Sequence, residues 1–146
     1  MPKINAVIAC EGLALDAITG RVTAFNALDT IFLARLPALL QRLHVLVSYE
    51  RVADSGPVQE RVTILSPTGA VLARTKETEL QLTLPFHNSL HAIWGLKFEE
   101  QGDLEIVVEH REGDADFREV FRRKLRAELQ PHPLMPTITA PAEQSS

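Results

Sequence analysis

The sequence predicts an all-β fold, an antiparallel β-sandwich of about seven to eight strands. Two observations carry this prediction. Apolar residues recur at every second position in several separate segments, which is the period of a strand with one buried face. Short clusters of Gly, Pro, Ser and Asp separate these segments, as they do in sheets built from hairpins.

The first third of the chain begins with an apolar strand that ends in Cys10. Thr19-Gly20 then separates residues 13–18 from residues 21–25, which predicts a hairpin. The segment 33–43 is ambiguous, and we interpret it as a crossover at the end of the sandwich. Pro37 fits the first position of a helix, so this crossover has at most a short helical turn near 37–42.

Apolar and polar residues alternate most clearly in the middle of the chain. Each of its segments has an apolar row that predicts the buried face of a strand. The rows are Leu43, Val45, Val47 and Tyr49; Val58, Val62 and Ile64; Leu80, Leu82 and Leu84; Leu90, Ala92, Trp94, Leu96 and Phe98; and Leu104, Ile106 and Val108. In this scheme Trp94 belongs to the central core.

Residues 117–129 fit both a strand and a helix. As a strand, the segment buries its apolar residues and presents Arg118, Arg122, Lys124 and Arg126 on the other face. We favour the strand because the rest of the chain is β. Beyond it, residues 130–146 hold four of the nine prolines and no Lys or Arg. The predicted organisation is therefore a sandwich domain over 1–129 and a disordered tail over 130–146.

The N-terminal part also carries a recognisable order of features. The strand ending in Cys10 leads to a short hairpin, a D-x-I segment at 29–31, a P-A pair at 37–38 and an apolar strand over 43–50. This order resembles a family of uncharacterised bacterial β-sandwich proteins, most closely over residues 4–50. The resemblance implies the sandwich fold, and it implies no activity and no site residues.

Composition excludes several classes of protein. The chain has 146 residues, a formal net charge of −4 and one cysteine, so it has no disulfide framework and no multi-thiolate metal site. Its acidic balance argues against nucleic acid as a partner. It contains no apolar run long enough to span a bilayer and no secretory leader. We therefore expect a cytoplasmic protein without a membrane contact and without a cofactor.

Two histidines have the clearest metal-like spacing. His87 and His91 would lie on one face of a helix, where such a pair can chelate zinc. The segment more closely resembles a connection that leads into the strand at Leu90, where the two rings need not converge. The predicted metal site is therefore none, with His87 and His91 as the weak candidates. Cys10, at the end of an apolar strand, is expected to be a small core residue.

The basic residues Arg118, Arg122, Lys124 and Arg126 form the one local excess of positive charge. They are candidates for contact with a partner or an anion. Charges of this kind also protect an edge strand against aggregation. No phosphate loop or nucleophile motif is present.

These observations favour a non-catalytic β-sandwich that acts through protein–protein contact, by self-association or within a larger assembly. The expected partner is the chain itself or another protein. The alternative is a sandwich that binds a small molecule or a carbohydrate near Trp94 or near His87 and His91. A third hypothesis is a metal-dependent enzyme that uses the two histidines.

Overall fold

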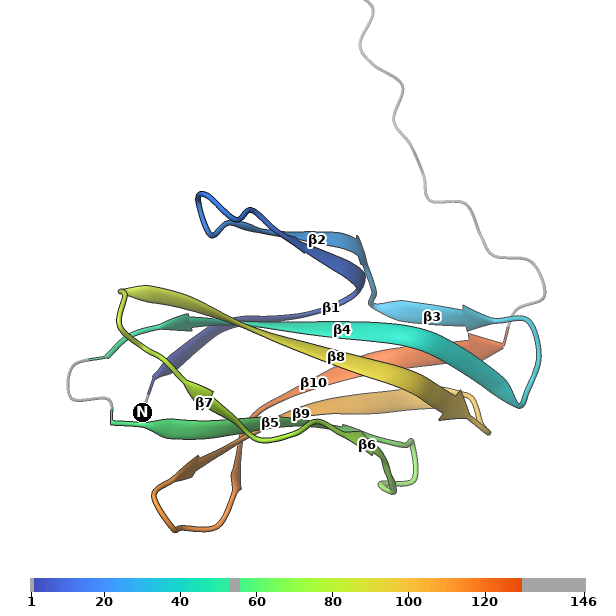
Figure 1. The fold of residues 1–146 in the computed structure, drawn as a ribbon. Helices are drawn as coiled ribbons and strands as arrows, with labels where there is room; N and C mark the ends of the chain where they lie inside the picture. The colour runs from blue at the N-terminus through green and yellow to red at the C-terminus, as the bar shows by residue number, and fades with distance from the viewer. Residues whose placement is uncertain (1, 53–55, 130–146) are drawn as a thin grey trace, which may run out of the picture.

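The computed structural model describes residues 2–52 and 56–129, which form two packed sheets (Figure 1). The predicted all-β sandwich is confirmed, with ten strands and no helix in the described ranges. None of these residues therefore forms a helix that could cross a membrane. The strands are β1 (Lys3–Leu15), β2 (Val22–Ala27), β3 (Thr30–Leu33), β4 (Ala38–Glu50), β5 (Val58–Leu65), β6 (Val71–Arg74), β7 (Thr78–Leu80), β8 (Phe86–Phe98), β9 (Gly102–Glu112) and β10 (Arg118–Leu129). The predicted tail, 130–146, lies outside the described residues.

The two sheets are nearly all antiparallel. The four-stranded sheet has the order β2-β1-β4-β8. The six-stranded sheet has the order β3-β10-β9-β5-β6, and β7 also pairs with β5. Only β3 and β10 run parallel. In the four-stranded sheet β8 pairs with β4 along its whole length and has no second described neighbour, so it is an edge strand.

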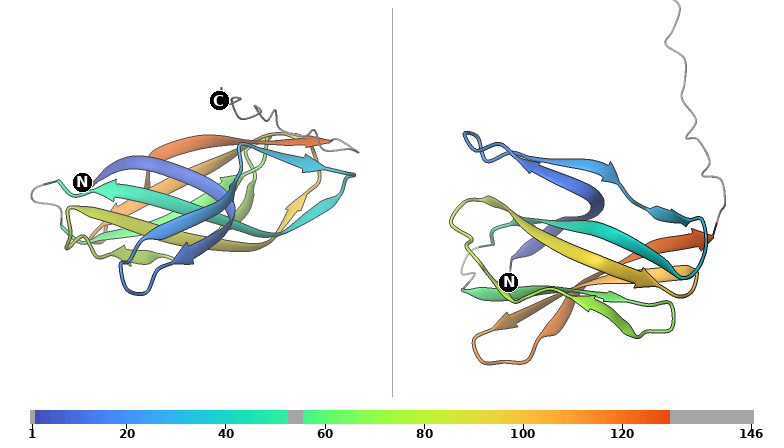
Figure 2. Two further views of the ribbon diagram at one scale, coloured as in Figure 1. Left: turned by 90° about the horizontal axis from the view of Figure 1, so that it is seen from above. Right: turned by 45° about the vertical axis from the view of Figure 1, so that its right-hand side comes forward.

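The hairpin predicted around Thr19-Gly20 joins β1 to β2. The Asp16 carboxylate accepts hydrogen bonds from the backbone N–H groups of Ile18 and Thr19, at 2.9 and 3.2 Å. Gly20 closes the turn with φ of +70°, a conformation that glycine adopts without steric cost. The second half of β1 and β2 curve away from the rest of the sandwich (Figures 1 and 2).

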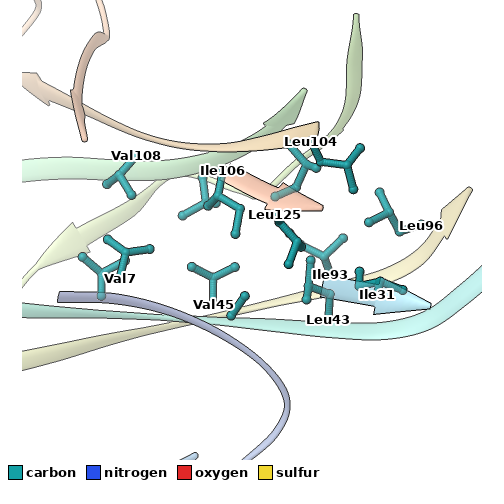
Figure 3. Packing of buried hydrophobic residues seen from close by; sticks show 14 of the residues in the cluster. Val7, Ile31, Leu43, Val45, Ile93, Leu96, Leu104, Ile106, Val108 and Leu125 are labelled. Atoms are coloured by element: carbon teal, nitrogen blue, oxygen red, sulfur yellow. The ribbon is translucent and has the colours of Figure 1, made fainter. Parts of the chain in front are cut away.

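The core lies between the sheets and consists of aliphatic rows from both of them (Figure 3). On the four-stranded sheet the predicted row Leu43, Val45, Val47 and Tyr49 is fully buried. Opposite lie the predicted rows of β5 and β9, Val58, Val62 and Ile64 with Leu104, Ile106 and Val108. Each such side chain contributes about 1.5–3 kcal/mol by its removal from water. The period-two pattern therefore located most of the core.

Both ambiguous segments contribute strands. In the first, residues 34–37 connect β3 to β4, and residues 38–42, within the range 37–42 for which the sequence allows a helical turn, are the start of β4, with Ala38 opposite Phe98 of β8. The cross-strand pairing there outweighs the weak helix signal of one proline. The strand predicted over 117–129 is confirmed as β10, with Leu125 and Ala127 buried.

The prediction for Trp94 is wrong. Trp94 is 68% exposed on the outer face of β8, although Leu96 and Phe98 of the same predicted row are buried. Gly95 lies between them with φ of +69°. This left-handed residue shifts the alternation of β8 by one position, while the pairing with β4 keeps the same register on both sides of it. Before Gly95 the residues that point inward are therefore Ser89, His91 and Ile93.

Candidate functional site

The inner face of β8 carries two polar residues that meet a buried glutamate. Glu60, on β5 of the opposite sheet, is fully buried. Its Oε1 atom lies 2.5 Å from the Ser89 hydroxyl and 2.7 Å from His91 Nε2. The Ser89 hydroxyl also lies 2.9 Å from His91 Nε2. This contact joins the two sheets through their polar rather than their apolar side chains.

The other carboxylate oxygen of Glu60 meets a second histidine. His110, on β9 beside β5, places its Nε2 atom 2.9 Å from Glu60 Oε2 and 2.8 Å from the Tyr49 hydroxyl on β4. His110 and Tyr49 are 1% and 0% exposed. We call these five residues the Glu60 cluster: Tyr49, Glu60, Ser89, His91 and His110.

The donors of the cluster determine the charge of Glu60. Burial raises the pKa of its carboxyl, but hydrogen bonds from His110, His91 and Ser89 and attraction to His91 outweigh burial and hold the pKa below its ordinary value. Glu60 is therefore an ionised carboxylate at neutral pH. Because an ionised carboxylate can only accept hydrogen bonds, the Nε2 atoms of His91 and His110 must each carry a proton that is donated to Glu60.

The second ring nitrogen of His110 is not used by the cluster. Its Nδ1 atom is buried without a hydrogen-bond partner among the described residues. His110 also lines a cavity of about 150 Å³ together with Glu112, Ala115, Asp116 and Arg118. Because Nε2 carries a proton, Nδ1 of the neutral ring is a hydrogen-bond acceptor.

The Glu60 cluster does not have the geometry of a nucleophilic triad. In a triad, one imidazole nitrogen faces the serine and the other faces the carboxylate. Here the same Nε2 atom of His91 faces both Ser89 and Glu60. The serine hydroxyl donates to the carboxylate at 2.5 Å, and Ser89 is only 6% exposed. The arrangement stabilises a buried charge and cross-links the sheets.

His87 and His91 are not brought together. Both lie on β8, and two residues four positions apart in a strand are separated by about 13 Å. His91 is committed to Glu60, whereas His87 lies opposite Tyr49 of β4. Among the described residues no group of three or more His, Cys, Asp and Glu side chains is placed to hold a metal ion.

Cys10 is fully buried, as predicted. Burial raises the pKa of its thiol, and a hydrogen bond with the backbone of Gly12 opposes that rise only in part. The thiol therefore stays protonated at neutral pH, which is the unreactive form of cysteine.

The predicted basic residues lie on β10, and acidic neighbours pair with two of them. Arg122 bonds to Glu105 and Glu119, and Arg126 lies 3.5 Å from Asp103 and 3.7 Å from Glu128. Arg118 and Lys124 are exposed on the same strand. The positive charge of this strand is thus partly balanced by acidic residues of β9 and of β10 itself.

The outer face of β8, an edge strand, exposes several large apolar side chains. Phe86, Leu90 and Trp94 are 67%, 42% and 68% exposed, and Ala92 lies between the last two. Trp94 sits beside Arg42, whose guanidinium carbon is 6.0 Å from the centre of the indole, and beside the ring of His44. We call Phe86, Leu90, Ala92 and Trp94 the β8 outer row.

Sequence reasoning missed Glu60 and His110, although a signal for both was present. Glu60 lies between Val58 and Val62, and His110 follows Leu104, Ile106 and Val108 at the same spacing. Strict alternation therefore places both polar residues on the buried face. A charged residue at an inward position indicates buried partners, since an unpaired buried charge is too costly.

Comparison with known proteins identifies a family. No curated protein and no solved structure matches the chain significantly. Residues 5–117, which include most of both sheets and the whole Glu60 cluster, match the model of a family described as a family of unknown function (DUF6941). The chain belongs to this family.

Proposed function

We propose that this chain is a non-catalytic β-sandwich that acts by contact with another protein chain, through the β8 outer row. The observation that carries the proposal is the exposure of Phe86, Leu90 and Trp94 on a strand whose second edge has no described partner. Exposed apolar residues that lie together on one surface are typical of protein interaction sites. Trp and Phe are also the side chains that most often anchor interfaces.

The polar interior supports the same proposal. The Glu60 cluster is enclosed, and its hydrogen-bonding groups are largely used in joining the sheets. The proposal includes the expectations that the chain works in the cytoplasm of a bacterium and that its partner is itself or another protein. It involves no membrane, nucleic acid or cofactor.

Two measurements test the proposal together. Light scattering over a dilution series reports self-association. A photo-cross-linking amino acid at position 94, compared with one at exposed Val71 on β6, reports contact with any protein in the host cell. We expect association or specific cross-links from position 94. A chain that is monomeric at every concentration and cross-links no more from position 94 than from position 71 overturns the proposal.

One observation favours a second candidate function. The exposed indole of Trp94 is flanked by Arg42 and His44, so it offers a flat apolar surface with hydrogen-bonding groups beside it. Such a surface suits the face of a sugar ring or of another small ring. A thermal-shift screen against sugars and small ring compounds tests this candidate. If the candidate is right, one of these compounds raises the melting temperature of the chain, and Trp94→Ala abolishes that rise.

A further inference from the structure

We propose that the partner of β8 is a second copy of the same chain, which pairs with it in antiparallel orientation about a two-fold axis at Leu90. The two four-stranded sheets then become one continuous sheet. This inference rests on the proposed function, because it names the occupant of the β8 surface. Its argument comes from the edge, the charges and the spacing of β8.

The edge of β8 differs from the other edges of the described fold. A free strand edge offers unpaired N–H and C=O groups, and proteins usually shorten or charge such edges. The other strands at the ends of the two sheets are short, since β2 has six residues, β3 and β6 have four and β7 has three. By contrast β8 has 13 residues, with no proline and no charged residue from Phe86 to Leu96 except the two histidines. This edge lacks the usual protection.

The charges favour a copy of the chain over a charged peptide. Residues 86–96 of β8 carry no Asp, Glu, Lys or Arg, and the cation beside them, Arg42 of β4, already lies over the ring of Trp94. Two copies of β8 meet without like-charge repulsion, because Lys97 lies beyond the paired segment. Isologous pairing, in which the same surface is used twice, is the commonest way in which proteins form dimers.

The spacing of the β8 outer row is symmetric. The regular part of the strand ends at Trp94, before Gly95 with φ of +69°. The midpoint of residues 86–94 is Leu90. With a two-fold axis there, Phe86 of each copy lies opposite Trp94 of the other, Asn88 lies opposite Ala92, and Leu90 faces Leu90. Aromatic and aliphatic pairs of this kind stabilise antiparallel strands.

The Glu60 cluster holds the β8 edge in place before any partner arrives. Ser89 and His91 alternate with the outer row and fasten the strand to Glu60 of the other sheet. A strand that is already ordered loses little conformational entropy when it pairs. The inward polar row and the outward apolar row of β8 thus have complementary roles.

Disulfide trapping tests the register in the full-length chain. In a Cys10→Ala background, single cysteines are placed at the outward positions 88, 90 and 92. Residues that lie opposite each other have Cα atoms about 4.5–5.5 Å apart, which a disulfide can bridge. The two copies of position 88 would be about 13 Å apart along the strand, which a disulfide cannot bridge.

The proposal requires a definite pattern under mild oxidation. Leu90→Cys alone forms a covalent dimer, Asn88→Cys alone and Ala92→Cys alone do not, and a mixture of these two variants does. Because each chain carries a single cysteine, every disulfide joins two chains. A covalent dimer of Asn88→Cys alone, or none of Leu90→Cys, overturns the proposal.

A charge substitution gives the second measurement. Leu90→Lys places two lysines face to face and is expected to raise the dimer dissociation constant at least about tenfold. Leu72→Lys, at an exposed leucine on β6, is the matched control and leaves the constant unchanged. Equal effects of the two substitutions overturn the proposal.

These outcomes separate this inference from the proposed function. Two outcomes contradict the proposed β8 dimer but not the proposed function. Either position 94 cross-links only to other proteins, or the chain dimerises while Leu90→Cys forms no disulfide. If position 94 makes no specific contact at all and the chain stays monomeric, both proposals fail.

Discussion

Ser89 and Glu60 join the two sheets of the sandwich, because the hydroxyl of Ser89 on β8 donates a 2.5 Å hydrogen bond to Glu60 Oε1 on β5. Both residues are buried, and the same carboxylate also accepts hydrogen bonds from His91 and His110. A buried carboxylate with three donors is stable as an ion, whereas the loss of one donor leaves part of its charge uncompensated.

Glu60 makes the free energy of unfolding depend on pH in the acid range. Its pKa in the folded chain lies below the ordinary value of 4.5, because the hydrogen bonds from His110, His91 and Ser89 outweigh the effect of burial. The unfolded chain therefore binds the proton more readily. The resulting stabilisation is fully present above about pH 5 and is lost as the pH falls through 4.5 toward the folded-state pKa. Urea unfolding over this pH range measures the slope.

Glu60→Gln makes that slope smaller, leaving the contributions of Asp16 and Glu109, whose pKa values are also lowered, and it lowers stability. We expect a loss of about 2–4 kcal/mol at pH 7, because an amide cannot accept at both ends from two histidines and a serine. Glu79→Gln on β7 is the matched control, since Glu79 is exposed, and it is expected to change stability by less than about 0.5 kcal/mol. An unchanged acid slope in Glu60→Gln would contradict the assignment.

Ser89→Ala is expected to cost about 1.5–3 kcal/mol, because it removes a hydrogen bond to a buried charge. Asn88→Ala changes the neighbouring residue, which points outward on the same strand and is exposed. It should cost less than about 0.5 kcal/mol when measured in dilute solution, below the concentration at which the proposed dimer forms. Equal losses for the two variants would mean that the Ser89 hydroxyl contributes nothing to the cross-link.

The fold was predictable wherever side chains alternated without interruption. Val45 and Ile106 lie in apolar rows that alternate with mostly polar residues, and these rows located the core even though Leu46 and Val107, on the opposite faces of the two strands, are also buried. The prediction failed at Trp94 because the alternation changes phase at Gly95, and a glycine in a strand does not by itself reveal a positive φ.

The Glu60 cluster depends on contacts between distant strands. His91 and Glu60 are 31 positions apart in the sequence, and His110 and Glu60 are 50 positions apart. Alternation places each of these residues on an inward face, but it does not say which inward positions of the two sheets meet. The packing of the sheets determines that, and no local pattern in the sequence encodes it.

Leu43→Ala tests the core. Leu43 is fully buried on β4, whereas Leu39 on the same strand is 57% exposed. Removing the buried side chain leaves a cavity and is expected to cost about 2–5 kcal/mol. Leu39→Ala is expected to cost less than about 0.5 kcal/mol. Chemical denaturation of both variants measures the difference, and equal losses would contradict the inward orientation of Leu43.

Gly102→Ala tests the start of β9. Gly102 has φ of +140°, and a Cβ atom there would lie 3.0 Å from Cγ of Pro67. Pro67 is a rigid ring in the turn after β5, so we expect a loss of about 1–3 kcal/mol from the clash and the backbone strain. Gly56→Ala is the matched control, because a Cβ at Gly56 would meet no atom within 4 Å. A thermal midpoint of Gly102→Ala equal to that of Gly56→Ala would contradict this close approach.

Trp94 reports directly on the β8 surface, because it is the only tryptophan in the chain. At 68% exposure its fluorescence in dilute solution should resemble that of indole in water and should be quenched efficiently by acrylamide. A blue-shifted and protected emission in the monomer would contradict the position of Trp94 on the outer face.

Trp94 also reports on the proposed pairing of two β8 strands. As the concentration rises through the dimer dissociation constant, Phe86 of the second copy covers the indole, so the emission shifts to the blue and acrylamide quenching falls. Leu90→Lys should keep the spectrum of the dilute protein over the same concentrations, since it removes the pairing and leaves Trp94 in place.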